Sequence, residues 1–240
     1  MEALRTVLAD MKSQGVTEII SVGDVIGYGP NPIQCVDVAR KEFALCVQGN
    51  HENALLVEME TASFNVRARN SIDWTREQFS MLGERREQNR PRWDWLGTLE
   101  ESHAEDDMLF VHGTPRDPIS EYLYPSDIYQ PDKLEEIFSL MDRVCFVGHT
   151  HVPGIWTEDM VYLSPEEMNY HYRFGHKKTI VNVGSVGQPR DGDPRATYVL
   201  FDDGAVTYRR VEYPINETVV KIRKIPELDP SLAERLLAGR

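Results

Sequence analysis

Residues 144–151 read Val-Cys-Phe-Val-Gly-His-Thr-His, an apolar and largely β-branched run that ends in a glycine and two histidines. A short run of this kind predicts a buried strand of an α/β sheet. The same arrangement recurs where apolar runs end in Val22-Gly23-Asp24, Gly49-Asn50-His51-Glu52 and Val111-His112-Gly113. Because ligands of such sheets gather beyond the carboxyl ends of the strands, we expect these polar side chains to share one site.

Helical and strand patterns alternate at the start of the chain and again in its second half. Apolar spacing predicts a helix over 2–14, and Asn31-Pro32 is typical of the N-cap and first turn of a second helix. Strands are expected at 18–22, 43–48, 108–111, 143–147, 179–183, 196–202 and 205–211, with another helix at 131–141. The alternation favours parallel pairing, whereas the last strands, joined by the turn Asp203-Gly204, indicate a mixed or antiparallel second sheet.

A mostly helical insert at about 63–100 interrupts this alternation. Its candidate apolar anchors are Trp74, Phe79, Trp93, Trp95 and Leu96. Its arginines, Arg85, Arg86, Arg90 and Arg92, could contact an anionic substrate, although charge runs more often form solvated faces. No linker or repeat divides the chain, so the sequence predicts a single domain over 1–240.

Composition narrows the classes of partner. The formal net charge of -13 and the pI near 5.0 oppose sequence-independent binding to nucleic acid, which depends on basic side chains. The chain has no apolar run long enough for a membrane span and no signal pattern at its start, so we expect a cytoplasmic protein without membrane attachment. Cys35, Cys46 and Cys145 show no CxxC spacing and are interpreted as small buried hydrophobic residues.

The polar residues at the strand ends form a mixed ligand set. Each fragment alone is more often a turn, a cap or a structural histidine, but their joint occurrence favours a metal site. Asp24, Asn50, His112 and His149 offer a carboxylate, an amide oxygen and two imidazoles, which suit Mn, Fe, Zn or Ni better than calcium. His151 follows His149 by two residues, and on an ideal strand the two rings would point to opposite faces. A loop that straddles two neighbouring metals is therefore the natural geometry.

The motifs GDVIGYG at 23–29, GNHE at 49–52, VHG at 111–113 and GHTHVP at 148–153 together resemble the calcineurin-like metallophosphoesterase superfamily. The segment GSVGQPRDGDPRATY at 184–198, with Asp73-Trp74-Thr75-Arg76, is similar to its bacterial single-domain phosphodiesterase and diadenosine-tetraphosphatase-related group. The resemblance implies an α/β fold, a four-layer αββα sandwich of two mixed β-sheets flanked by helices.

The resemblance also implies a function, a metal-dependent hydrolase of phosphate esters, either a phosphodiesterase or a phosphatase. Asp24 would bridge two metals, Asn50, His112 and His149 would complete the second metal, and His151 would bind the first. A metal-activated hydroxide would attack phosphorus in line, and His51 would contact the phosphate and protonate the leaving oxygen. Manganese is the expected metal, and a small phosphate ester or nucleotide the expected substrate.

The segment at 184–198 offers a candidate contact with the substrate phosphate. Arg190 can grip two phosphate oxygens, with Gly184-Ser185 and Arg195 nearby in sequence. The alternative interpretation of this segment is a structural turn held by salt bridges.

The chain departs from the family pattern at its beginning, Met1-Glu2-Ala3-Leu4, where the family has a strand ending in Asp-x-His before the helix. Without that strand the first metal keeps Asp24 and His151, fewer protein ligands than a catalytic site normally has, so we expect about one metal per molecule. The favoured explanation is a truncated start, with an in-frame upstream segment that supplies the strand. The alternatives are an interaction scaffold of the same fold, against which the retained His51 argues, and a single-metal hydrolase.

Overall fold

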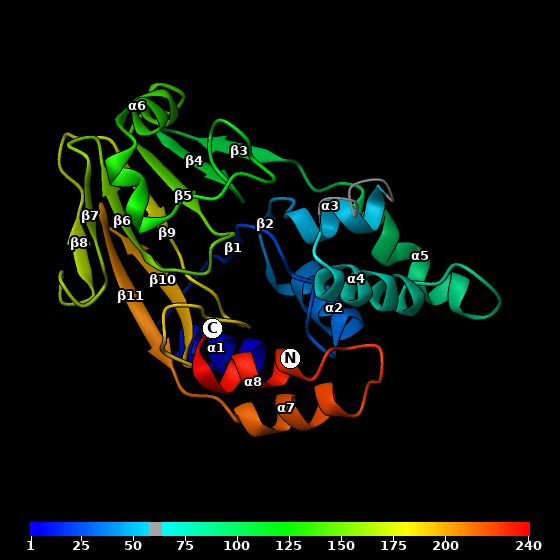
Figure 1. The fold of residues 1–240 in the computed structure, drawn as a ribbon. Helices are drawn as coiled ribbons and strands as arrows, with labels where there is room; N and C mark the ends of the chain where they lie inside the picture. Colours follow the sequence, from blue (N-terminus) through cyan, green and yellow to red (C-terminus); the bar gives the residue numbers. More distant parts are fainter. Residues whose placement is uncertain (58–63) are drawn as a thin grey trace.

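The computed structural model describes residues 1–57 and 64–240. Its largest sheet has the strand order β3-β4-β5-β9-β6-β7 (Figure 1). The strands are β3 (Ser102–Glu105), β4 (Met108–Val111), β5 (Val144–Val147), β9 (Thr179–Asn182), β6 (Gly154–Thr157) and β7 (Val161–Leu163). The central strands β4, β5 and β9 are parallel, and the outer ones pair antiparallel. All four residues of β5 are buried, as a parallel strand covered on both faces requires.

Two smaller sheets lie opposite the large one. One has the antiparallel order β10-β11-β8, formed by β10 (Ala196–Asp202), β11 (Ala205–Val211) and β8 (His171–Arg173). The other is the parallel pair β1 (Ile20–Ser21) and β2 (Leu45–Cys46). Asp203 and Gly204 both have positive φ, 45° and 69°, which is the backbone that the expected hairpin turn requires. The mixed α/β class is confirmed. The layer opposite the large sheet consists of two separate sheets, because β1 and β10 do not pair in the described chain.

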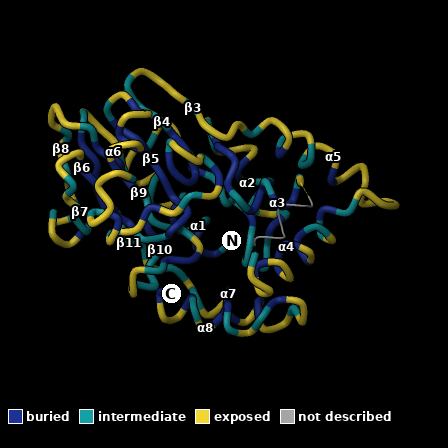
Figure 2. Tube along the Cα trace, turned by 45° about the horizontal axis from the view of Figure 1, so that its top comes forward, coloured by how far each residue is buried: buried dark blue, intermediate teal, exposed yellow. Residues whose placement is uncertain are grey.

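Apolar side chains hold the layers in the order αββα (Figure 1). Phe110 and Phe146 of the large sheet pack against Tyr208 of β11 in the core between the sheets. The helix α6 (Pro131–Ser139) covers the outer face of the large sheet, and α1 (Glu2–Ser13) packs on β10. Buried residues fill the strands β5, β9 and β6 of the large sheet, whereas exposed residues gather on the peripheral helix α5 (Figure 2).

The remaining helices surround the ends of the two smaller sheets. They are α2 (Pro32–Glu42), α3 (Asn50–Leu56), α4 (Val66–Gln78), α5 (Arg85–Leu96), the 3-10 helix η2 (Pro125–Tyr129), α7 (Ile215–Arg223) and α8 (Ser231–Ala238). Helices α4 and α5 account for most of the insert expected at about 63–100, of which residue 63 lies outside the described chain. No helix in the described ranges combines the length and apolarity that crossing a bilayer requires.

The apolar and the basic residues of the insert have different structural roles. Phe79 and Leu96 are buried beside Val36 of α2, so they anchor the insert as expected. Arg92 donates to both carboxylate oxygens of Asp37 on α2, at 2.8 and 2.6 Å, while Arg85, Arg86 and Arg90 are exposed. The basic cluster is therefore a structural and solvated face. Helix α2 begins at Asn31-Pro32 as expected, although the Asn31 side chain makes no cap hydrogen bond and instead accepts from Lys221.

A cavity of about 300 Å³ lies between α1, β1 and β10 and reaches Asp24. Val7 of α1 packs on Ala196 and Tyr198, whereas Leu4 and Leu8 border the cavity. The apolar face of the first helix therefore packs partly on β10 and partly borders this cavity.

Asp10 connects α1 to the sheet below it. Its carboxylate accepts from Arg209 at 2.9 and 3.2 Å and from the Tyr198 hydroxyl at 2.8 Å, and hydrogen bonding to Arg209 lowers the pKa of Asp10 below its ordinary 3.8. We expect Asp10→Asn to reduce the free energy of unfolding by about 1–3 kcal/mol at pH 7, the range for charged hydrogen bonds. Because the folded pKa is depressed, this stabilisation exists above pH 3.8 and is lost as the pH falls below it.

Denaturant unfolding between pH 7 and pH 2 measures this effect. Asp203→Asn is the control, because the Asp203–Arg173 ion pair is exposed and should contribute less than about 1 kcal/mol. Equal losses in the two variants, or an unchanged acid dependence in Asp10→Asn, would contradict the role of this carboxylate.

Candidate functional site

The polar segments singled out in the sequence meet at the carboxyl ends of the strands. Asp24 follows β1, Asn50 and His51 open α3 after β2, and His112 follows β4. His149 follows β5, and like Asp24 it has a positive φ, 59° and 55° respectively, so the chain turns sharply at both. The turns direct the side chains of three different strand ends toward one another.

Three ligand-type atoms surround one ring nitrogen. Nε2 of His112 lies 2.9 Å from Nδ1 of His149, 3.2 Å from Oδ1 of Asn50 and 3.3 Å from Oδ2 of Asp24. Ligand atoms of Asp24, His112 and His149 all lie within 4.8 Å of one another. The structure therefore brings together the four residues that the sequence suggested as one ligand set.

Backbone carbonyls decide which nitrogen of each ring faces the centre. Nδ1 of His112 lies 2.8 Å from the carbonyl oxygen of Val22, and Nε2 of His149 lies 3.1 Å from that of Ser120. A carbonyl can only accept, so these nitrogens donate, and the lone pairs of His112 Nε2 and His149 Nδ1 face each other and the oxygens of Asp24 and Asn50. With both rings neutral this arrangement is repulsive unless a proton on His112 Nε2 or a metal cation sits among these atoms, and the donor set fits a transition metal.

The charge states of the side chains agree with a cation site. Burial would raise the pKa of the Asp24 carboxyl, but the imidazoles of His112 and His51 outweigh burial and lower that pKa, so Asp24 is ionised. Burial and then His112 lower the pKa of His149 to about 3, which keeps its lone pair available. Burial would lower the pKa of His112, yet the Asp24 carboxylate raises it. The Asp24 carboxylate thus favours a positive charge at the His112 ring. An anionic oxygen beside imidazole nitrogens is a typical transition-metal donor set.

His151 lies outside the group of three. Its Nδ1 donates to the carbonyl oxygen of Gln188 at 2.7 Å, which leaves Nε2 free to act as a ligand. Burial, followed by Arg190, lowers the pKa of His151 to about 3, so the ring is neutral. Its assignment to a first metal stays a prediction.

His51 is buried beside the group without belonging to it. Its backbone N–H donates to Oδ1 of Asp24 at 3.1 Å, and its side chain is 4% exposed. The ring makes edge contacts with Tyr28 and Phe64, at centroid distances of 4.7 and 5.4 Å. Nδ1 of His51 has no hydrogen-bond partner within the described chain, and burial lowers the pKa of the ring. A buried imidazole without a structural hydrogen bond is a candidate for proton transfer.

Glu52, quoted above in the segment at 49–52 without a role of its own, is a positioning residue. Its fully buried carboxylate accepts from the backbone N–H groups of Asp24, Gly49 and Ile26, at 2.8, 2.9 and 3.1 Å. These bonds fasten the loop after β1 to the first turn of α3, and so place Asp24 opposite Asn50. Its signal in the sequence was a glutamate three residues after Gly49, the spacing of a capping box.

An aromatic stack forms another part of the site that the sequence analysis missed. The Tyr122 ring stacks on His149 at 3.8 Å between centroids and 21° between planes, and Tyr124 stacks on Tyr122 at 5.5 Å. Both tyrosines are partly exposed. The stack holds the imidazole of His149 in a fixed orientation.

Of the two candidate arginines in the segment at 184–198, one is ion-paired and the other bonds a neutral amide oxygen. Arg195 is ion-paired with Asp193, so for this residue the salt-bridge interpretation holds. Arg190 hydrogen-bonds to Oε1 of Gln188 at 2.7 and 3.2 Å and lies over the Tyr28 ring, 5.8 Å from its centroid. Arg190 thus lies beside an aromatic neighbour of His51.

Comparisons with known proteins found a matching family model and similar proteins. The model of the calcineurin-like phosphoesterase superfamily domain matches residues 1–204. The chain is 37% identical over 246 residues to the uncharacterized protein MJ0912 of Methanocaldococcus jannaschii, covering 100% of this chain and 94% of that protein. The crystal structure of a metallophosphoesterase from Sphaerobacter thermophilus is similar, with 37% identity, a TM-score of 0.82 and coverage of 100% and 94%. A hypothetical protein, PH1004 from Pyrococcus horikoshii, shares the fold at 15% identity and a TM-score of 0.74, with the same coverage.

Proposed function

The chain belongs to the calcineurin-like phosphoesterase superfamily, a family of metal-dependent phosphoester hydrolases, and from this we propose that it hydrolyses small phosphate esters or nucleotides as a phosphodiesterase or phosphatase. The observation that carries the proposal is the pair of facing lone pairs on His112 and His149, set against the Asp24 carboxylate. A divalent cation would satisfy these atoms together, and phosphate ester cleavage is a reaction that such cations promote.

Asp24, Asn50, His112 and His149 would hold a divalent metal, and we propose manganese because oxygen and imidazole donors are mixed in this set. When bound, the metal supplies a Lewis acid for a phosphate oxygen and lowers the pKa of a water molecule. The protein orients the ligands through Val22, Ser120 and the Glu52 carboxylate. This second layer of hydrogen bonds sets the geometry of the site before substrate arrives.

We propose His51 as the acid that protonates the leaving oxygen. Edge contacts with Tyr28 and Phe64 orient its ring, and no hydrogen bond to a described residue competes for Nδ1. A phosphate anion beside the ring favours the protonated imidazole, which counteracts burial. The acid would therefore be formed as the substrate binds.

The charge of the chain bears on its partners. A net charge of -13 favours a small anionic ester held by a few local cations over a nucleic acid that must meet an extended basic surface. We also propose a cytoplasmic location, since Cys35, Cys46 and Cys145 are free thiols, which suit a reducing compartment.

Gly27 offers a test of His51 that leaves its imidazole in place. A Cβ at Gly27 would lie 2.4 Å from Nδ1 of His51, and Gly27 has a φ of 104°, so Gly27→Ala must displace the ring. We expect turnover to fall at least about tenfold, since misplacing a catalytic group by about 1 Å can cost about 100-fold, with unchanged metal content. Gly29→Ala is the control, because its Cβ would meet no atom closer than 3.6 Å. Similar activities of the two variants would contradict the placement of His51.

A substrate panel tests the proposed function. Metal-free protein is loaded with Mn²⁺ and assayed on bis(p-nitrophenyl) phosphate, p-nitrophenyl phosphate and nucleotides, and EDTA-treated protein is the control. Metal-dependent hydrolysis supports the proposal, and the ratio of rates on diester and monoester separates phosphodiesterase from phosphatase. Protein that holds Mn²⁺, Fe²⁺, Zn²⁺ or Ni²⁺ yet hydrolyses none of these esters would favour the scaffold instead.

A further inference from the structure

Three arginines from distant parts of the chain converge beside the site. Arg190 comes from the loop after β9, Arg235 from α8 and Arg67 from α4. The guanidinium carbons of Arg190 and Arg235 both lie 5.8 Å from the centroid of the Tyr28 ring. Arg67 donates to the hydroxyl of Ser231, the first residue of α8, at 3.2 Å. In a chain with 39 acidic and 26 basic residues, such a gathering of cations needs a reason.

The position of Tyr28 connects this cluster to the chemistry. Its ring contacts His51 edge-on at 4.7 Å, and its backbone N–H donates to the Ser71 hydroxyl of α4 at 2.8 Å. Tyr28 also packs on the apolar cluster that joins Trp74 of α4 to α7 and α8. Packing and hydrogen bonds therefore hold Arg190 and Arg235 at a set place next to the proposed acid.

None of the three guanidinium groups pairs with a side-chain carboxylate in residues 1–57 and 64–240. Arg190 bonds the Gln188 amide oxygen, Arg235 the main-chain oxygen of Arg240, and Arg67 a hydroxyl. The Gln188 and Ser231 oxygens are neutral, whereas the Arg240 oxygen belongs to the last residue of the sequence. Together these acceptors take few of the donors of the three forks, so most of that capacity is unused. The cluster is available to an anion.

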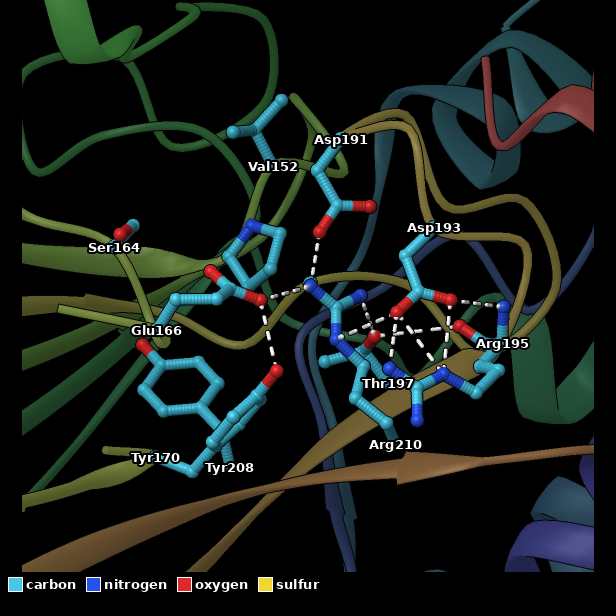
Figure 3. A network of polar contacts seen from close by, with 12 residues as sticks. Val152, Ser164, Glu166, Tyr170, Asp191, Asp193, Arg195, Thr197, Tyr208 and Arg210 are labelled. Carbon is cyan, nitrogen blue, oxygen red and sulfur yellow. Dashed lines mark hydrogen bonds and ion pairs between the residues drawn. The ribbon is translucent and has the colours of Figure 1, made fainter. Parts of the chain in front are cut away.

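Neighbouring arginines show the opposite arrangement (Figure 3). Arg210, 4% exposed, is ion-paired with Asp191, and Arg195 with Asp193. Both acidic partners belong to the same loop as Arg190. The loop thus supplies carboxylates for the arginines that hold it together and none for the arginine that faces Tyr28.

The convergence is electrostatically unfavourable for the protein alone. Burial lowers the pKa of Arg235 below its usual range, and repulsion from the neighbouring Arg190 lowers it further. Arginine forks bind phosphate oxygens with charge-assisted bonds, and a bound phosphate would relieve this repulsion. Contacts with the Tyr28 ring offset part of this repulsion, and a bound anion would offset more of it.

We propose that Arg190 and Arg235, beside Tyr28 and with Arg67 at the rim, form a second anion subsite that holds a phosphate group of the substrate other than the one cleaved. This inference rests on the proposed hydrolase function and narrows its substrate class to phosphate esters that carry a second phosphate. Arg235 lies outside the matched range 1–204, so the subsite depends on the C-terminal helix of this chain. The second phosphate would position the scissile ester beside His51.

The test compares two substrates that differ by one phosphate. Thymidine 5′-(p-nitrophenyl phosphate) and its 3′-phosphorylated analogue have the same leaving group, and we expect the second to have the higher kcat/KM. Arg235→Gln should reduce the ratio of the two kcat/KM values at least about tenfold, because one charge-assisted contact to the second phosphate is lost. Arg67→Gln, at an exposed position, should reduce it in the same direction by about twofold to fivefold.

Arg173→Gln is the matched control, because it removes the same charge from an exposed ion pair on β8 and should keep the ratio unchanged. An unchanged ratio in Arg235→Gln and Arg67→Gln, or equal losses in Arg173→Gln, would overturn the proposal.

Binding separates failure of the subsite from failure of the hydrolase function. Calorimetry measures thymidine 3′,5′-bisphosphate, thymidine 5′-phosphate and inorganic phosphate on the wild type and on Arg235→Gln. Tighter binding of the bisphosphate that is lost in Arg235→Gln supports the subsite even if neither ester is hydrolysed. Inorganic phosphate that binds as tightly as the bisphosphate, and depends equally on Arg235, would overturn the substrate assignment and point to a site for free phosphate.

Discussion

His112→Ala is expected to weaken metal binding by more than about 100-fold, because even the hydrogen-bond partners of metal ligands typically contribute about 10–100-fold. Nε2 of His112 is the atom around which Asp24, Asn50 and His149 gather, at 3.3, 3.2 and 2.9 Å. Removing the ring takes away one ligand and also the group against which the other three are placed. Phosphoesterase activity should fall to that of the metal-free protein.

Elemental analysis after dialysis, with titration of Mn²⁺ into metal-free protein, measures this loss. The wild type should retain about one ion per molecule, since the described chain contains one group of three such ligands. His103→Ala is the control, because His103 lies on β3, is 35% exposed and contacts Glu100 instead of the site. Two tightly held ions in the wild type, or unchanged metal content in His112→Ala, would contradict the assignment.

His51→Ala is expected to lower turnover by about 10² to 10⁴, the range for loss of a general acid, without releasing the metal. The contact of His51 with Asp24 is made by the backbone N–H, which alanine retains, and its side chain donates to no metal ligand in the described residues. The loss should be smaller for p-nitrophenyl esters, because that leaving group departs without a proton.

Steady-state kinetics and metal analysis on the same preparation test this variant. A fall in metal content that parallels the fall in activity would identify His51 as a ligand. A loss that is equal for alkyl and aryl esters would remove its role as the leaving-group acid.

Local patterns in the sequence were sufficient for several elements and for the ligand types. The strand at 108–111 and the hairpin strands 196–202 and 205–211 have the predicted bounds, and Asp203-Gly204 makes the predicted turn. Periodicity and turn chemistry act between near neighbours in the chain, so they are visible in one sequence. The rule that ligands gather at the carboxyl ends of parallel strands then placed Asp24, Asn50, His112 and His149 together.

Other features depended on partners far away in the sequence. Short-range pattern located the start of α2 at Asn31-Pro32, but the partner of the Asn31 amide oxygen, Lys221 from α7, comes from a distant part of the chain. The strands expected at 18–22 and 43–48 are longer than the observed strands β1 and β2. An apolar run indicates burial, whereas the length of a strand depends on how far a neighbouring strand pairs with it. The layer opposite the large sheet is divided for the same reason.

The sequence by itself determined which side chains could bind a cation, because residue types at strand ends carry that information. The tertiary structure decided which ring nitrogens face it, through the carbonyls of Val22, Ser120 and Gln188, whose positions depend on loops far from the histidines they contact. It also decided which arginines are structural, since Arg195 has Asp193 two residues away, whereas Arg190 meets Arg235 only through folding. Hydrogen bonds and charge interactions act through space, and the chain brings their partners together only after its layers have packed.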